Sequence, residues 1–241
     1  MSHLLAETRI ILVHPTLPEN VGAVARAMRH FQLRDLVLAE GGVDPLHPLA
    51  LRVAAGAEGI LEGARRVATL EAALEDVVFA VGTTARTVQS VDMRPIEPHE
   101  AALLARDHAQ VGAVALVFGT EKHGLPRSYL QRCHQVARIP GSEGACLNLA
   151  MAMTLFGYEW FLAADSHAHE TPLLATAASE AEIDRLGKWF TEAFMASGIF
   201  RVQDASSKSH TLRRILSKAR LDADEAALIR AIAAKLSKLL P

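Results

Sequence analysis

The chain has 241 residues, which is long enough for one large domain or for a domain with an appendage. Half of the residues are hydrophobic and 22% are charged, which excludes the disordered and collagen-like classes. Taken over the whole chain, the formal net charge of −2 argues against a protein coated in positive charge for wrapping nucleic acid.

Cysteine content and hydropathy bear on the environment of the chain. The two cysteines, Cys133 and Cys146, cannot make a disulfide framework and lack the close pairing of a structural zinc site. We therefore expect no metal and a reducing, cytoplasmic environment. Residues 145–164 have the length of a membrane span, but polar residues such as Asn148 and Glu159 interrupt them. This pattern favours a buried helix and no membrane partner.

Along the first two thirds of the chain, apolar runs of strand length alternate with segments of helical period. This alternation is typical of βα units that build a parallel sheet. We expect strands at residues 10–13, 36–39, 77–81, 113–118 and 136–139. We expect helices at residues 21–31, 48–57, 70–74, 97–107 and 147–162. The predicted fold class is α/β, with a parallel sheet and helices on both faces.

Residues 164–178 lack a clear period and are rich in small and polar residues, which indicates a linker between a domain at 1–163 and an extension at 179–241. The extension has no strand signal, and its amphipathic segments predict helices at residues 180–197, 210–219 and 222–239. A unit of this size has a marginal core of its own, so we expect it to pack on the main domain or on a partner chain.

The charge is divided unevenly between these two regions. Residues 1–178 carry a net charge of −5, whereas residues 179–241 carry +3, and +5 is concentrated in residues 201–220. Such a run is typical either of a solvated helix face or of a surface that binds phosphates, and interleaved serines would supply further donors. The cations of this run are Arg201, Lys208, Arg213, Arg214, Lys218 and Arg220, against Asp204 alone.

The first segment with candidate chemistry follows the first predicted strand, at residues 14–31. Gly22, Arg26 and Arg29 share one helix face there, while apolar side chains occupy another. The two arginines either keep the surface soluble or act on a ligand.

Two further segments, VGTTAR at 81–86 and VFGTEKHGLP at 117–126, each include or follow the end of a predicted strand. Ligands of open α/β sheets bind at the carboxyl ends of strands. The second segment lacks the Lys and Ser/Thr of a phosphate-binding P-loop, and no dinucleotide fingerprint follows any strand.

The fourth segment, at residues 139–160, is a glycine-rich loop that leads into a helix that is apolar nearly all round. One side of this helix carries Leu147, Met151, Leu155 and Leu162, and another carries Leu149, Met153, Phe156 and Trp160. Such a helix must be covered on several faces, which indicates a subunit interface as readily as a monomer core. Cys146 is either a nucleophile or a small buried thiol, and the absence of an adjacent base favours the thiol.

In this order, NVGAVARAM (20–28), VGTTAR (81–86), FGTEKHGL (118–125) and IPGSEGACLNLAMA (139–152) resemble the motifs of the SPOUT RNA methyltransferases. The resemblance is closest to the TrmJ-type tRNA 2′-O-methyltransferases, because it continues into LRRILSKAR (212–220) and ALIR (227–230). It implies a C-terminal trefoil knot in the α/β domain, an obligate homodimer and S-adenosyl-L-methionine as cofactor.

The resemblance also implies a reaction and a set of site residues. The reaction is 2′-O-methylation of tRNA ribose at nucleotide 32 of the anticodon loop. Arg26 is the expected catalytic residue, which orients and stabilises the 2′-oxygen or its phosphate, while Asn20 and Glu121 shape the site. The implied cofactor positions are Thr83, Thr84, Ala85, Gly119, Ile139, Ala145, Cys146 and Leu147. The tRNA contacts that we expect are Arg29, Arg86, Lys208, Arg213, Arg214, Lys218 and Arg220.

The sequence departs from the family pattern at one place, and it leaves alternative functions open. Many relatives have serines where this chain has Ala145 and Cys146, and a thiol is a weaker donor than a hydroxyl. The alternatives are an rRNA 2′-O-methyltransferase of the same superfamily, a non-catalytic RNA-binding protein on this scaffold, and an unrelated nucleotide-using α/β enzyme. The C-terminal LRR motif favours tRNA, and Arg26 together with the cofactor loops favours catalysis.

Overall fold

A computed structural model describes residues 2–85, 93–142, 145–165, 178–201, 203, 205–219 and 221–239. Its described strands form one parallel sheet in the order β3-β2-β1-β5-β4-β6. The strands are β1 (Thr8–Val13), β2 (Asp35–Ala39), β3 (Arg65–Val67), β4 (Val77–Thr83), β5 (Ala113–Phe118) and β6 (Gln135–Ala137). The parallel α/β class predicted from the sequence is confirmed.

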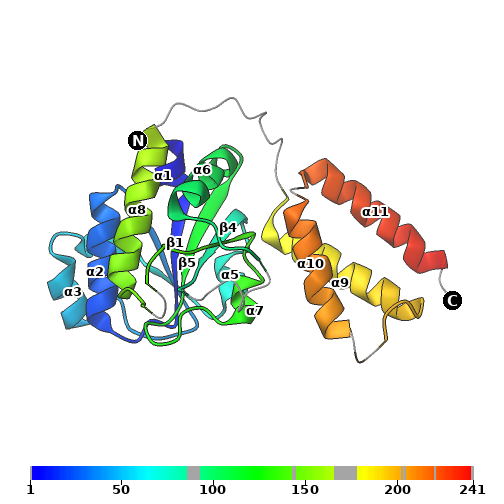
Figure 1. Cartoon of the computed structure of the whole chain (residues 1–241), viewed down its shortest axis with the longest axis horizontal. Helices are drawn as coiled ribbons and strands as arrows, with labels where there is room; N and C mark the ends of the chain where they lie inside the picture. The colour runs from blue at the N-terminus through cyan, green and yellow to red at the C-terminus, as the bar shows by residue number, and fades with distance from the viewer. Residues whose placement is uncertain are drawn as a thin grey trace.

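Helices cover both faces of this sheet, and three more form a separate unit beside it (Figure 1). One face is covered by α1 (His3–Glu7), α2 (Pro18–His30), α3 (Pro48–Ala54), α4 (Glu58–Glu62), α6 (Pro98–Ala109) and α8 (Leu149–Asp165). The other face is covered by α5 (Leu70–Ala73) and α7 (Arg127–Leu130). The helices of the C-terminal unit are α9 (Glu180–Ala196), α10 (Ala205–Lys218) and α11 (Ala223–Leu239).

Side-chain alternation along the strands explains the two apolar cores. Ile10 and Leu12 of β1 point into the core under α2 and α8, whereas Ile11 and Val13 point into the core under α5 and α7. All four are almost completely buried. Successive strand residues point to opposite faces, so a strand covered on both sides is apolar throughout, as the sequence of β1 is.

The structure differs from the expected elements where the local pattern is short or polar. The expected helix at 48–57 ends at Ala54, because Ala55 and Gly56 have positive φ angles of 44° and 92°, and a separate helix, α4, begins at Glu58. The edge strand β3 consists of Arg65, Arg66 and Val67, which have no apolar run. The helices α1 and α7 span five and four residues, which is too short for a periodic signal.

The last strand lies between two parts of the chain that come earlier in the sequence. The Thr84 N–H donates to Ala137 O at 3.0 Å, and on the other side the Ile96 N–H donates to Val136 O at 3.0 Å. The Arg138 N–H then donates to Ile96 O at 2.9 Å. The end of β6 is thus held by residues 84 and 96, immediately before the chain enters residues 139–147.

Among the described helices, none combines the length and apolar character needed to cross a membrane. The expected linker at 164–178 begins within α8, which continues to Asp165, and its residues 166–177 lie outside the described part of the chain.

Candidate cofactor and RNA site

A cavity of about 450 Å³ opens at the carboxyl ends of β4, β5 and β6. Three loops line it, at residues 83–85, at 118–125 and at 138–142 with 145–147, and α8 closes it from one side. All eight expected cofactor positions are among its lining residues: Thr83, Thr84, Ala85, Gly119, Ile139, Ala145, Cys146 and Leu147. The structure therefore brings together three motifs that begin at residues 81, 118 and 139 of the sequence.

The loop after β5 is shaped by a close backbone contact at Gly119. A Cβ atom on Gly119 would lie 2.1 Å from the carbonyl carbon of Gly124 and 2.2 Å from the Leu125 nitrogen, so only glycine fits. The contact closes a tight turn in which the Gly124 N–H donates to Thr120 O at 2.8 Å and Gly124 has a φ of 63°. This turn directs the backbone of residues 119–124 toward the cavity.

The loop before α8 contains the two positions where serines were expected from the family pattern. Cys146 is exposed, and its thiol makes a weak contact with Leu147 O at 3.5 Å. It is neither a buried thiol nor paired with a base in the described contacts, and it lies on the cavity wall. The Ala145 N–H donates to Ser142 O at 3.2 Å, so backbone groups shape this part of the loop.

Glu121 joins the cavity loop to the start of α2. Its carboxylate accepts the Thr16 N–H at 3.0 Å, the Thr16 hydroxyl at 2.8 Å, the Leu17 N–H at 3.1 Å and the Asn20 amide at 3.1 Å. Asn20 Oδ1 in turn accepts the Asn148 amide at 2.9 Å, and Asn148 Oδ1 accepts the Ala150 N–H at the first turn of α8. Asn20, Glu121 and Asn148 thus form one connected network, as expected of residues that shape the site.

This network sets the ionisation of Glu121. Partial burial raises the pKa of Glu121, but the hydrogen bonds from Asn20, from Thr16 and from its own backbone outweigh burial and hold the pKa below its ordinary value. A carboxylate whose pKa is lowered by folding stabilises the protein above the unfolded-state pKa of about 4.3. This contribution is lost as the pH falls through the lower pKa of the folded state.

We expect Glu121→Gln to lower the free energy of unfolding by about 1–3 kcal/mol at pH 7, because its amide group faces donors and leaves at least one of them unpaired. Denaturant unfolding at pH 7 and at pH values below 4 measures the effect. The difference from the wild type should shrink as the pH falls, since the wild-type carboxylate is then protonated. The exposed Glu62→Gln is the matched control, and an equal loss in both variants would contradict the role of the network.

Arg26 and Arg29 lie outside the cavity of their own chain. Both are exposed on α2, and neither is among the residues that line the cavity. Gly22 on the same helix packs so closely on α3 that a Cβ would lie 2.1 Å from Ala50 O, and the Arg29 guanidinium lies over Gly56. The shared helix face is confirmed, but within one chain this face does not form the mouth of the cavity.

The apolar helix α8 has one buried side and one side that is exposed within a single chain, although its sequence predicts that several faces are covered. Met153, Phe156 and Trp160 are 0–1% exposed, and Leu149 is also buried. On the other side Leu147, Met151, Leu155, Tyr158 and Leu162 are 42–60% exposed within a single chain. We call these five residues the apolar stripe.

The residues expected to contact tRNA differ in their exposure to solvent. Arg213 is 8% exposed, and its guanidinium bonds to protein groups on both sides, so the expectation that Arg213 binds RNA is corrected. Lys218 is exposed, Arg214 is half-buried, and Lys208 lies 4.9 Å from the centre of the Phe200 ring. Arg86 and Arg220 lie outside the described residues.

Several cavity residues were not singled out from the sequence. Phe118, Leu149 and Phe156 form apolar wall, and Lys122 and Arg138 add positive charge to the lining. All but Phe156 fall within or directly beside the recognised motifs, so motif position was the available signal. Among the described residues, no group of three or more His, Cys, Asp or Glu side chains is placed to hold a metal ion.

Comparison with known proteins places these features in context. The SpoU rRNA methylase family model matches residues 7–158. The tRNA (cytidine/uridine-2′-O-)-methyltransferase TrmJ of Pectobacterium atrosepticum is 33% identical over 245 residues, which cover 98% of each chain. The crystal structure of TrmJ from Z. mobilis has a TM-score of 0.81 at 29% identity, and covers 95% of this chain and 98% of its own. A probable methyltransferase from Bordetella pertussis has a TM-score of 0.63 at 35% identity, over 68% of this chain and 99% of its own.

Proposed function

The chain belongs to the SpoU methylase family, and we propose that it transfers a methyl group to a ribose 2′-oxygen of tRNA. The observation that carries the tRNA substrate is the extent of the match to the P. atrosepticum enzyme, which includes α9–α11 as well as the α/β domain. The family description names rRNA methylases, so rRNA is the second candidate. The C-terminal unit, with its net charge of +3, favours tRNA, which the enzyme would meet in the cytoplasm.

We propose S-adenosyl-L-methionine as the methyl donor. The cavity volume of about 450 Å³ falls in the range of small-molecule sites, and its lining combines apolar side chains with backbone and hydroxyl groups. Phe118, Leu149 and Phe156 suit the faces of a purine ring, while Thr83 and Ser142 offer polar groups to a ribose or an amino acid. The donor supplies an electrophilic methyl group, and the protein must hold the ribose oxygen in line with it.

We propose that a homodimer completes this site. The apolar stripe on α8 would be covered by a second copy of the chain, which removes its exposed apolar surface from water. Because α2 packs beside α8, and Asn148 bonds to Asn20 between them, a two-fold contact over the stripe brings α2 of one subunit close to the cavity loops of the other. The partner subunit's Arg26 would then reach the cavity that Arg26 of the same chain does not line.

In this arrangement Arg26 has an electrostatic role. A ribose hydroxyl is a poor nucleophile at neutral pH, so charge that develops on the 2′-oxygen must be stabilised. A guanidinium does so without titrating, and its fork of donors also suits the neighbouring phosphate. We propose four of the described cations as further tRNA contacts: the exposed Arg29 and Lys218, and the half-buried Arg214 and Lys208.

We also propose that the α/β domain contains the trefoil knot of the SPOUT fold. The position of the end of β6 between Thr84 and Ile96 supports this proposal. Threading would hold Arg138 and Ile139 against the loop at residues 83–85, which explains how three short loops enclose one cavity.

The proposed reaction is tested by incubating the protein with S-adenosylmethionine labelled on the methyl group, and with bulk tRNA or rRNA. We expect label in tRNA, in a nucleotide that resists alkaline cleavage because its 2′-oxygen is methylated, and mapping should place it at nucleotide 32. Label in rRNA alone would replace the proposed substrate with the second candidate. Cofactor binding without transfer to any RNA would indicate a non-catalytic RNA-binding protein.

A further inference from the structure

The C-terminal unit has an apolar core that is separate from both cores of the α/β domain. This small core contains Ala178, Ile183, Leu186, Leu216 and Ala226. It forms because α9 begins with a capping box, in which Ser179 and Glu182 exchange hydrogen bonds, and because α10 and α11 pack on α9. Among the described contacts between this unit and the α/β domain is a cluster of charged side chains.

Arg213 is the centre of this cluster. Its Nε donates to Asp184 Oδ1 at 2.6 Å, and its Nη2 donates to Glu180, both on α9. On the other side its Nη1 donates to Gln131 O at 2.6 Å and its Nη2 to Arg132 O at 2.8 Å. Residues 131 and 132 belong to the turn between α7 and β6, so one guanidinium bonds to both units.

Glu180 extends the contact from the first residue of α9. Its Oε1 lies 2.8 Å from Nε2 of His134, and both side chains are less than 10% exposed. Nδ1 of His134 accepts the Ala80 N–H at 2.9 Å, and the opposite ring nitrogen, Nε2, faces Glu180. Burial raises the pKa of Glu180, but His134 and Arg213 outweigh burial and keep the pKa below its ordinary value.

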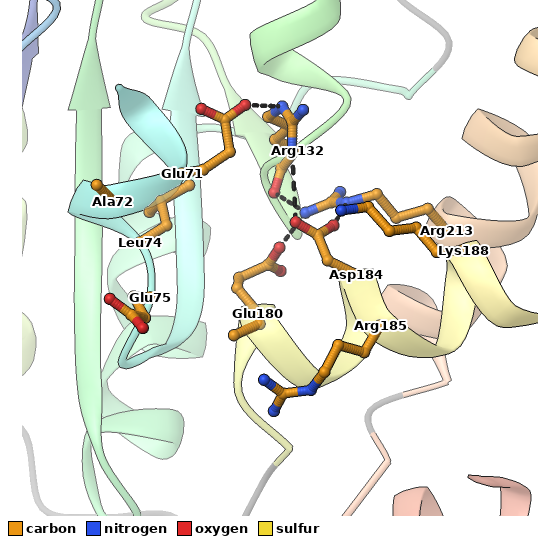
Figure 2. Close-up of a pocket in the computed structure, with 11 residues that line it drawn as sticks. Glu71, Ala72, Leu74, Glu75, Arg132, Glu180, Asp184, Arg185, Lys188 and Arg213 are labelled. Atoms are coloured by element: carbon orange, nitrogen blue, oxygen red, sulfur yellow. Dashed lines mark hydrogen bonds and ion pairs between the residues drawn. The ribbon is translucent and has the colours of Figure 1, made fainter. Parts of the chain in front are cut away.

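Arg132 makes a second bridge beside the first (Figure 2). Its Nε lies 2.7 Å from Glu71 Oε1 on α5, and its Nη1 lies 3.5 Å from Asp184 Oδ2 on α9. The close-up shows the Arg132 side chain between these two carboxylates, with Asp184 also facing Arg213. The contact thus has charged partners from α5, from the turn before β6, from α9 and from α10.

We infer that Arg213, Glu180, Asp184, Arg132 and His134 form a docking contact that holds the C-terminal unit in one orientation on the α/β domain. Arg213 is then a positioning residue, which orients the RNA-binding surface instead of contacting RNA. Buried polar contacts of this kind require defined geometry, because a misplaced unit leaves charges without partners. An apolar contact between the units would tolerate sliding. The docking contact is inferred from geometry alone, and only its effect on catalysis rests on the proposed tRNA substrate.

The position of the docking contact explains why it would matter for the reaction. The turn that accepts the Arg213 hydrogen bonds leads directly into β6, and Arg138 and Ile139 after β6 line the cavity. Three strand residues span only about 10 Å. The C-terminal unit is therefore anchored one short strand away from the cofactor loops, and a tRNA bound to it is delivered at a fixed distance from the cavity.

Docking itself is tested without RNA. Spin labels on Glu62→Cys and Glu192→Cys, both exposed positions, report the distance between the units in the full chain with Cys146→Ser, diluted with unlabelled chains. We expect a narrow distance distribution that broadens in Arg213→Ala and in Arg132→Ala, and stays narrow in Lys218→Ala. Arg132 belongs to the α/β domain, so Arg132→Ala leaves the core of the C-terminal helices intact. If Arg213→Ala unfolds these helices, the distance distribution of Arg132→Ala tests the docking contact. A narrow distribution in the Arg132→Ala chain and in a folded Arg213→Ala chain would overturn the inference.

The consequence for catalysis is tested by kinetics and salt dependence. We expect Arg213→Ala to raise the KM for tRNA roughly 10- to 100-fold with little change in kcat, because a tethered but undocked unit loses effective concentration. The slope of log affinity against log salt should stay that of the wild type. Lys218→Ala should reduce this slope by about 0.7 to 0.9, as expected for one lost phosphate contact.

An equal reduction in Arg213→Ala would show that Arg213 binds RNA and overturn its positioning role. Failure of the wild type to use tRNA would refute the proposed substrate and leave the distance measurement to decide docking.

Discussion

Gly119→Ala should reduce cofactor affinity about 100-fold and lower the free energy of unfolding by about 1–3 kcal/mol. The new Cβ would lie 2.1 Å from the carbonyl carbon of Gly124, and main-chain atoms cannot move aside as a flexible side chain can. The turn at residues 119–124 must therefore open, and these residues form one wall of the cavity. Calorimetric titration with S-adenosylmethionine and denaturant unfolding measure the two effects.

The matched control is Gly141→Ala. Gly141 lines the same cavity, but no heavy atom lies within 4 Å of an added Cβ, so this variant should bind the cofactor like the wild type. Equal affinity of the Gly119→Ala variant and the wild type would mean that the cofactor does not use this wall. Equal loss in the two variants would show that any added methyl group blocks the site, whatever the fit of the loop.

The extent to which the sequence predicts this fold follows from the length of each apolar pattern. Strands such as β1 and β5 are buried on both faces and read as continuous apolar runs, so they were predicted within two residues. The edge strand β3 pairs on one side only, and two of its three residues are exposed arginines. Its strand conformation depends on pairing with β2, which no local pattern contains.

The same distinction applies to the site. The three cavity loops carry sequence motifs because each has a local requirement, such as the close approach at Gly119. By contrast, Arg213 lies in a basic run next to Arg214, and nothing in that run marks one arginine as buried and the other as half-buried. The difference comes from Glu180 and from the carbonyls of residues 131 and 132, which are 33 to 82 residues away. Such partners become visible only when the chain is folded.

Arg26→Ala should lower kcat for methyl transfer about 100- to 1000-fold, which is the usual effect of removing one donor that stabilises developing charge. Its affinity for S-adenosylmethionine should remain that of the wild type, because the cavity loops are intact and Arg26 does not line the cavity of its own chain. Single-turnover transfer to tRNA and calorimetric titration measure the two quantities. Arg34→Ala, an exposed arginine beyond the end of α2, is the control. Unchanged turnover of the Arg26→Ala variant would remove this residue from the mechanism.

Mixing the two impaired variants, at a cofactor concentration too low to fill the Gly119→Ala cavity, then distinguishes action within a subunit from action across the dimer. If the partner subunit's Arg26 serves each cavity, a dimer of one Arg26→Ala chain and one Gly119→Ala chain has one complete site, made of the intact cavity of the first and Arg26 of the second. In an equimolar mixture half of the dimers are mixed, so about a quarter of the wild-type sites should return after subunit exchange. If Arg26 acted on its own cavity, no mixed dimer would contain a complete site and no activity would return. Recovery of activity would therefore establish that Arg26 of one chain acts in the cavity of another, as the proposed dimer requires.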